Sequence, residues 1–188
     1  MRNRFLEMEF HPANGRITSL RLRRKGKPGR NLLGAGGANW LGMYLEKPRA
    51  MSAWELDSAA SGPEMLKPAG PATVVQEGPE SISVQCDYTW GRSFLRLQTT
   101  LHADTPRIDC KLHVEWLERG GGNQDGPMLR AHWSVAGNPR KLRCDVPFAV
   151  VDRKAGHEVP AQKWVDVAAP GGGLAILNRG QYGHSLEG

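Results

Sequence analysis

Residues 81–90 read Ser-Ile-Ser-Val-Gln-Cys-Asp-Tyr-Thr-Trp, and apolar or aromatic side chains alternate with polar ones along the whole stretch. Such an alternation puts the two kinds of side chain on opposite faces of an extended chain. We therefore predict a β-strand that buries one face and exposes the other to solvent.

Two similar segments follow directly. Gly91-Arg92 is a candidate two-residue turn, and the alternation resumes from Leu95 to Leu101. Residues 104–107, Asp-Thr-Pro-Arg, give the next turn signal, and a third alternating segment runs from Ile108 to Trp116. The sequence therefore predicts three consecutive antiparallel strands over residues 81–116.

The pattern continues on both sides of these strands. Upstream, residues 6–10 and 17–22 alternate and are separated by a turn at Asn14-Gly15, which predicts a hairpin. Downstream, shorter candidate strands lie at Leu129–Val135, Leu142–Val151, Lys163–Val167 and Leu174–Asn178. No segment shows the sustained 3.6-residue apolar period of an amphipathic helix. We therefore predict an all-β fold, an antiparallel β-sandwich, in which residues 1–188 form a single domain or part of one.

Stretches rich in glycine and proline mark the connections. We predict long loops near residues 57–71 and 120–127, and a flexible turn at residues 34–37, Gly-Ala-Gly-Gly. This turn lacks the flanking strand and helix of a phosphate-binding loop, so we expect no nucleotide there.

Composition and charge limit the kinds of binding partner that the sequence predicts. No apolar run approaches the roughly 18 residues that a membrane helix needs, so no membrane partner is expected. The net charge of +6 comes partly from residues 21–30, Arg-Leu-Arg-Arg-Lys-Gly-Lys-Pro-Gly-Arg, which could attract nucleic acid or another polyanion. Because leucine and arginine alternate there, we favour a strand with one solvated face, and we expect no nucleic-acid partner.

The number and spacing of the cysteines indicate whether the protein belongs to an oxidising or a reducing compartment. Cys86, Cys110 and Cys144 are an odd number and are widely spaced, so we predict buried free thiols. Residues 1–7 mix acidic and basic side chains where a secretory signal would be apolar. Both observations favour a cytoplasmic protein.

Glu55 and Asp57 are a closely spaced pair of carboxylates beside an aromatic residue, Trp54. Glycoside hydrolysis needs two carboxylates on either side of the scissile bond. Glutamate and aspartate two residues apart are common on any solvated strand, however, so we predict no catalytic residue in this chain. For Trp54, stacking on a sugar ring and filling the core are left equally open.

The six histidines lack the spacing of a local metal motif, and we predict no metal site. A proton-transfer site of the aldose mutarotase kind would need paired histidines and a carboxylate in one cleft. His102, His113 and Glu115 are the residues that could be nominated, but each falls on the polar face of its predicted strand.

Four stretches, in order, resemble the C-terminal β region of glycoside hydrolase family 38 α-mannosidases. They are residues 5–10 with 14–20, residues 44–48 with 53–57, residues 114–119, and residues 159–167 leading to 174–178. The most specific is Val-Pro-Ala-Gln-Lys-Trp-Val-Asp-Val at residues 159–167. The sequence departs from the family at Arg179, where relatives carry an acidic residue in an Asn-Asp-x-x-Tyr-Gly pattern.

This resemblance implies a β-sandwich of the galactose mutarotase type, the supersandwich, that follows an α/β catalytic domain and a helical bundle. The family continues into further strands beyond the position of residue 188, so the sandwich would be incomplete here. The related enzymes are retaining glycosidases whose zinc ion and aspartate nucleophile belong to the upstream domains. The resemblance thus implies that this segment holds no cofactor.

We therefore expect the β-sandwich portion of an α-mannosidase-like enzyme, which supports the upstream catalytic domain and contacts an α-mannoside. The candidate substrate-side residues are Tyr44, Trp54, Glu55, Asp57, Tyr182 and His184. The alternatives are a standalone carbohydrate-binding module and an aldose mutarotase-like enzyme. In the preferred interpretation the isolated chain does not hydrolyse α-mannosides.

Overall fold

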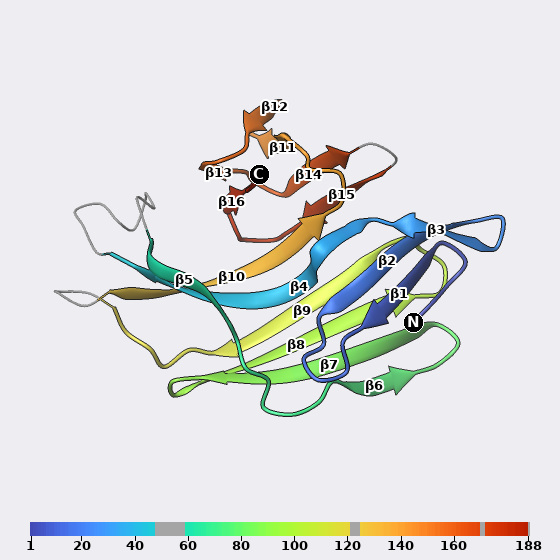
Figure 1. Ribbon diagram of the computed structural model, residues 1–188, viewed down its shortest axis with the longest axis horizontal. Coiled ribbons are helices and arrows are strands. Elements are labelled where there is room, and N and C mark those ends of the chain that lie inside the picture. The colour runs from blue at the N-terminus through green and yellow to red at the C-terminus, as the bar shows by residue number, and fades with distance from the viewer. Residues whose placement is uncertain (48–58, 121–124, 170–171, 188) are drawn as a thin grey trace. The chain divides into compact units, whose positions relative to one another are not determined.

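The computed structural model describes residues 1–47, 59–120, 125–169 and 172–187. Within these ranges all the helix and strand elements that the chain forms are β-strands, and there is no helix (Figure 1). The chain divides into two compact units. The first comprises residues 1–30 and 36–133, and the second comprises residues 31–35 and 134–188.

The first unit contains two antiparallel sheets. One has the order β1-β2-β4-β10, with β3 paired to β2 and β5 paired to β4. The bounds of these strands are β1 (Leu6–Phe10), β2 (Ile17–Arg24), β3 (Lys27–Asn31), β4 (Leu33–Glu46), β5 (Ala59–Met65) and β10 (Gly126–Val135). Leu6 pairs with Leu22 and Phe10 with Ile17, which confirms the predicted first hairpin.

The second sheet has the strands in chain order, β6-β7-β8-β9. Their bounds are β6 (Thr73–Glu77), β7 (Ser81–Trp90), β8 (Ser93–His102) and β9 (Ile108–Glu115). Trp90 pairs with Ser93 across the turn at Gly91-Arg92, so the predicted series of three antiparallel strands is confirmed.

The apolar faces of these two sheets pack against each other. Cys86 and Tyr88 of β7 and Leu95 of β8 share one buried cluster with Leu41 and Met43 of β4. Figure 1 shows the two sheets of this unit as face-to-face layers. The predicted antiparallel β-sandwich is thus confirmed, because the alternation in β7 and β8 supplies one apolar face per strand.

Two hydrogen bonds, one buried and one partly buried, connect parts of this sandwich. The Asn39 amide in β4 donates to the Thr99 hydroxyl in β8 at 3.0 Å. The Tyr88 hydroxyl donates to the backbone carbonyl of Asn14, in the turn between β1 and β2, at 2.7 Å. Burial is the main cause that raises the pKa of Tyr88, so the phenol stays protonated and remains a donor.

The second unit contains a four-stranded sheet of order β12-β11-β14-β15 and a two-stranded sheet, β13-β16. The bounds are β11 (Lys141–Val146), β12 (Ala149–Lys154), β13 (Glu158–Pro160), β14 (Trp164–Ala169), β15 (Gly172–Leu177) and β16 (Gly183–Ser185). Its core consists of Leu142, Cys144, Ala161, Val165 and Val167. The candidate strand at 142–151 is two strands, with residues 147–148 as the turn between them.

Two predicted connections were wrong. Residues 34–37 lie inside β4 instead of forming a flexible turn, and the predicted loop at 57–71 contains β5. The glycines are there because other atoms come close: a Cβ at Gly34 would lie 2.6 Å from the Ser134 Oγ, and one at Gly37 would lie 2.6 Å from the Ile17 carbonyl oxygen. Strand β5 pairs with β4, but its described side chains, residues 61–65, are all exposed, so it has no buried face that an apolar alternation would mark.

The prediction of buried free thiols is confirmed for two of the three cysteines. Cys86 and Cys144 are buried free thiols, whereas Cys110 is exposed. Cys110 lies on β9, which is the last strand of its sheet and, among the described strands, pairs with β8 alone. Among the described residues no helix is long and apolar enough to cross a membrane.

Candidate functional site

An aromatic and basic cluster lies on the outer face of β4 and of its neighbour β10. It consists of Trp40 and Tyr44 on β4 and of Arg130 and His132 on β10, and we call it the Trp40 cluster. In β4 these two aromatic residues alternate with Leu41, which faces the core. The cluster therefore lies on the face of the sheet that is turned away from the sandwich interior.

The rings of the Trp40 cluster are stacked. The His132 imidazole lies 3.9 Å from the Trp40 indole, centroid to centroid, with 8° between the ring planes. Its distance to the Tyr44 ring is 5.8 Å, and the His132 Nε2 is 3.4 Å from the Tyr44 hydroxyl. The Arg130 guanidinium carbon lies 5.1 Å from the centroid of the Tyr44 ring. Stacking and cation–π attraction thus hold four polarisable side chains in one arrangement.

Two glycines make room for this arrangement. A Cβ at Gly42 would lie 2.8 Å from the His132 Nε2 and 2.9 Å from Trp40 Cζ3. Gly62 of β5 has a φ of +126°, and a Cβ there would lie 2.6 Å from Tyr44 Cδ1. The backbones of β4 and β5 therefore approach the rings to a distance that only glycine permits.

Burial differs within the cluster. Tyr44 is 8% exposed, because β5 and the Arg130 side chain cover its ring. Trp40, Arg130 and His132 are partly exposed. The cluster thus combines a fixed aromatic base with hydrogen-bonding groups that solvent or a ligand can reach.

Of the predicted substrate-side residues, only Tyr44 belongs to this cluster. Trp54, Glu55 and Asp57 lie outside the described residues. Tyr182 and His184 belong to the second unit.

Tyr182 is a surface residue of the second unit, with 61% of its area exposed. His184 lies in β16 opposite Val159, and its Nε2 is 3.1 Å from the Gln181 carbonyl oxygen and 3.3 Å from the Asn178 amide nitrogen. Burial lowers the pKa of His184, so the imidazole is neutral at pH 7. Its contacts hold the turn before β16 in place.

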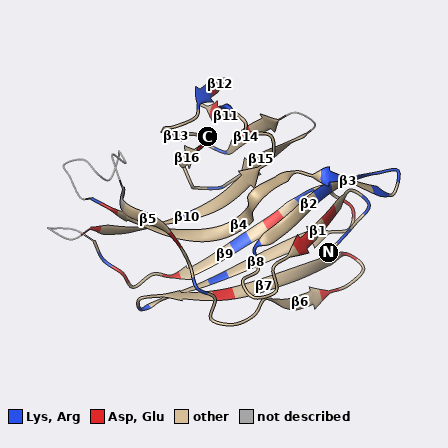
Figure 2. Cartoon of the chain, in the orientation of Figure 1, with Lys and Arg blue, Asp and Glu red and all other residues tan. Residues whose placement is uncertain are grey.

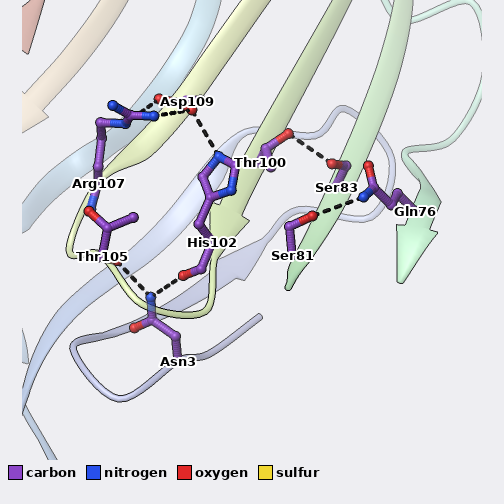
Figure 3. Close-up of polar contacts among 9 residues, drawn as sticks. All are labelled: Asn3, Gln76, Ser81, Ser83, Thr100, His102, Thr105, Arg107 and Asp109. Carbon is purple, nitrogen blue, oxygen red and sulfur yellow. Dashed lines mark hydrogen bonds and ion pairs between the residues drawn. The ribbon is translucent and has the colours of Figure 1, made fainter. Parts of the chain in front are cut away.

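The histidines of the second sheet contact separate carboxylates on its outer face. The His102 Nε2 lies 2.9 Å from the Asp109 carboxylate, which also receives the Arg107 guanidinium at 2.8 Å (Figure 3). His113 has another partner, Glu115, at 3.7 Å. The two histidines therefore do not share a carboxylate, and the site lacks the paired arrangement that mutarotase chemistry needs.

Metal ligands are not clustered in the part of the chain that the structure describes. Within residues 1–47, 59–120, 125–169 and 172–187, no group of three or more histidine, cysteine, aspartate or glutamate side chains could hold a metal ion. The described residues therefore do not fit a zinc site of the kind that needs three or four protein ligands.

Sequence reasoning missed Arg130 and His132. The positions of Trp40, Gly42 and Tyr44, two residues apart, could have shown that they share one face of a strand. Nothing in the sequence shows that β10, more than eighty residues later, pairs with β4. That pairing is what brings the imidazole and the guanidinium to the aromatic rings.

The fold and the cluster define the chain as an antiparallel β-sandwich protein with an aromatic and basic patch on an outer sheet face. The chain matches, over residues 1–188, the family described as "Glycosyl hydrolases family 38 C-terminal domain". It belongs to this family, as the sequence resemblance predicted. A search of curated proteins finds no match.

Proposed function

We propose that this domain is the β-sandwich portion of an α-mannosidase-like glycoside hydrolase, where it supports an upstream catalytic domain and contacts an α-mannoside. Membership in the C-terminal domain family of glycoside hydrolase family 38 supports the first part of this proposal. The Trp40 cluster is the single observation that supports the contact with sugar.

The chemistry of the cluster suits a sugar ring. The axial C–H groups of a pyranose pack against the electron-rich face of an aromatic ring, and its hydroxyls need hydrogen-bond donors and acceptors. Arg130 supplies only donors, whereas Tyr44 and His132 can each donate or accept. The aromatic base is already held in place by stacking, so little side-chain entropy is lost when a sugar binds.

The Trp40 cluster does not contain the catalytic groups for glycoside hydrolysis. Hydrolysis of a glycoside with retention uses two carboxyl groups about 5 to 5.5 Å apart, and no carboxylate belongs to the cluster. We infer that the nucleophile, the general acid and the zinc of the parent enzyme belong to its other domains. This domain then contributes binding and orientation.

The test is a titration of the 188-residue chain with methyl α-mannoside and with mannobiose, followed by NMR or calorimetry. We expect weak binding, with a Kd of about 1 mM or above, because few groups touch the ligand. The Trp40→Leu variant should lose this binding. Trp116→Leu is the matched control, because Trp116 is also partly exposed, at 36%, but lies outside the cluster.

The outcomes separate the two parts of the proposal. Equal binding by wild type and Trp40→Leu would refute the role of the cluster. No binding by the wild-type chain would refute its contact with sugar and leave the supporting role alone. Binding tight enough to work without a catalytic domain would favour the standalone carbohydrate-binding module.

A further inference from the structure

The positive charge of this protein is concentrated at one end of its sequence. Residues 1–30 contain nine of the 25 lysines and arginines but only two of the 19 aspartates and glutamates. Their formal charge is +7, and the remaining 158 residues together carry −1. The net charge of +6 therefore comes entirely from this segment.

Much of this charge lies on the hairpin formed by β2 and β3, and we call residues 21–30 the basic hairpin. Its two turn residues, Lys25 and Gly26, have φ values of +50° and +78°. Two successive left-handed residues make the tight turn that joins neighbouring antiparallel strands without splaying them. Figure 2 shows the lysines and arginines of this hairpin at the ends of β2 and β3.

Two arginines of the basic hairpin are engaged within the fold. The Arg23 guanidinium pairs with Glu7 of β1 at 2.7 Å. Arg21 donates to the Gly29 carbonyl oxygen and to the Ser19 hydroxyl, each at 3.1 Å. These contacts bind β2 to β1 and to β3, so the hairpin is held in a defined conformation.

The other four cations, Arg24, Lys25, Lys27 and Arg30, are exposed, and none pairs with a carboxylate among the described residues. Elsewhere on the first unit, some exposed arginines have acidic partners. Arg96 pairs with Asp87 at 2.8 Å, for example. The basic hairpin therefore presents charge that the rest of the described fold leaves unneutralised.

The four free cations are spread along the end of the hairpin. Arg24 and Lys27 flank the two-residue turn, so they lie opposite each other on paired strands. Arg30 follows Lys27 by three residues along β3, which places it about 10 Å further on and on the opposite face of the strand. An extended ligand with anionic groups at intervals can contact these separated cations, which one compact anion cannot.

We propose that the basic hairpin binds an anionic polysaccharide, one that carries carboxylate, sulfate or phosphate groups along an extended chain. The choice of a sugar polymer rests on the proposed function, because a glycoside hydrolase domain that holds a charged part of a glycan brings the rest of it near the enzyme. Residues 17–31 contain no aromatic side chain on which nucleic-acid bases could stack, so a single-stranded nucleic acid fits less well.

The test measures binding of fluorescein-labelled dextran sulfate to the 188-residue chain by fluorescence anisotropy at low salt. The hairpin variant is R24Q/K25N/K27Q/R30Q, with asparagine at residue 25 because it tolerates positive φ. The matched control is R140Q/R153Q/K154Q/K163Q, which removes four exposed cations from the second unit and leaves the same net charge. Circular dichroism and thermal melting report whether each variant is folded.

We expect the hairpin variant to bind dextran sulfate about tenfold more weakly and the control variant to bind almost as the wild type does. Wild-type affinity should fall steeply as salt rises, since screening and counterion release weaken such contacts. Equal weakening in both variants, equal binding of uncharged dextran, or no binding at low salt would overturn the proposal. Tighter binding of a 20-base-pair DNA duplex than of dextran sulfate at the same salt would overturn it in favour of nucleic acid.

These results are independent of the test for α-mannoside contact. The hairpin variant retains the Trp40 cluster, so its binding of methyl α-mannoside should equal that of the wild type. Loss of mannoside binding in Trp40→Leu with unchanged dextran sulfate binding would support both proposals as separate surfaces. Failure of one titration therefore does not imply failure of the other.

Discussion

Gly42→Ala tests the packing of the Trp40 cluster. The added methyl group would lie 2.8 Å from the His132 Nε2 and 2.9 Å from Trp40 Cζ3, closer than carbon and its neighbours pack without a shift. Both contacts are with ring atoms that are stacked at 3.9 Å between centroids, so neither ring can move without disturbing the other. Overpacking of this kind costs about 1–3 kcal/mol.

An opposing effect acts through the unfolded chain. Alanine has fewer unfolded conformations than glycine, which stabilises a folded protein by about 0.4–1 kcal/mol where the site accepts a methyl group. Gly78→Ala is the matched control, because a Cβ there meets nothing within 4 Å and the residue is in the same unit. The effect of the unfolded chain is common to both variants, so we expect Gly42→Ala to be less stable than Gly78→Ala by the overpacking cost, about 1–3 kcal/mol.

The assay is urea unfolding at pH 7, followed by tryptophan fluorescence, together with near-ultraviolet circular dichroism of the native state. Gly42→Ala should shift the midpoint to lower urea and reduce the aromatic dichroism that arises from the fixed Trp40 ring. Equal stability of the two alanine variants, with an unchanged near-ultraviolet spectrum, would refute the tight packing on which the proposed sugar contact depends.

Three further predictions concern single contacts and the chain as a whole. Tyr88→Phe removes the 2.7 Å hydrogen bond to the Asn14 carbonyl and should lower the free energy of unfolding by about 1–2 kcal/mol, whereas Tyr182→Phe, at an exposed residue, should change it little. Because burial lowers the pKa of folded His184, protonation favours the unfolded state, and stability is lost as pH falls below the ordinary value of 6.5. His184→Gln should show a smaller drop in melting temperature between pH 7 and pH 5, and an equal drop would contradict this. The isolated chain should not hydrolyse p-nitrophenyl α-mannoside with or without added zinc, and zinc-dependent turnover would overturn the view that the chemistry belongs to other domains.

Sequence patterns predicted the strands that bury one face. In residues 81–116 each strand alternates apolar and polar side chains, and the structure has β7, β8 and β9 there with the expected antiparallel register. The apolar face is buried in β7 and β8, whereas Cys110 and Leu112 of β9 are exposed. The prediction of an all-β sandwich rested on this alternation and was confirmed. The family was also readable, because it depends on the order of short motifs along the chain.

Other strands were missed because their sequences contain no such period. Strand β4 begins with glycines that close backbone and side-chain contacts require, and β5 pairs with β4 while its described side chains, residues 61–65, are exposed. The division into two units was also not predicted, because it depends on which residues touch and not on composition.

Prediction of the candidate site from sequence has the same limit. Sequence singled out Tyr44 through its motif, while the predictions for Trp54, Glu55 and Asp57 lie outside the described residues. The sequence alone determined that this chain forms strands with apolar faces and which family it belongs to, because both are local properties of the chain. Only the tertiary structure decided that Arg130 and His132 stand against Trp40 and Tyr44, because pairing between distant strands is set by the packing of the whole sheet.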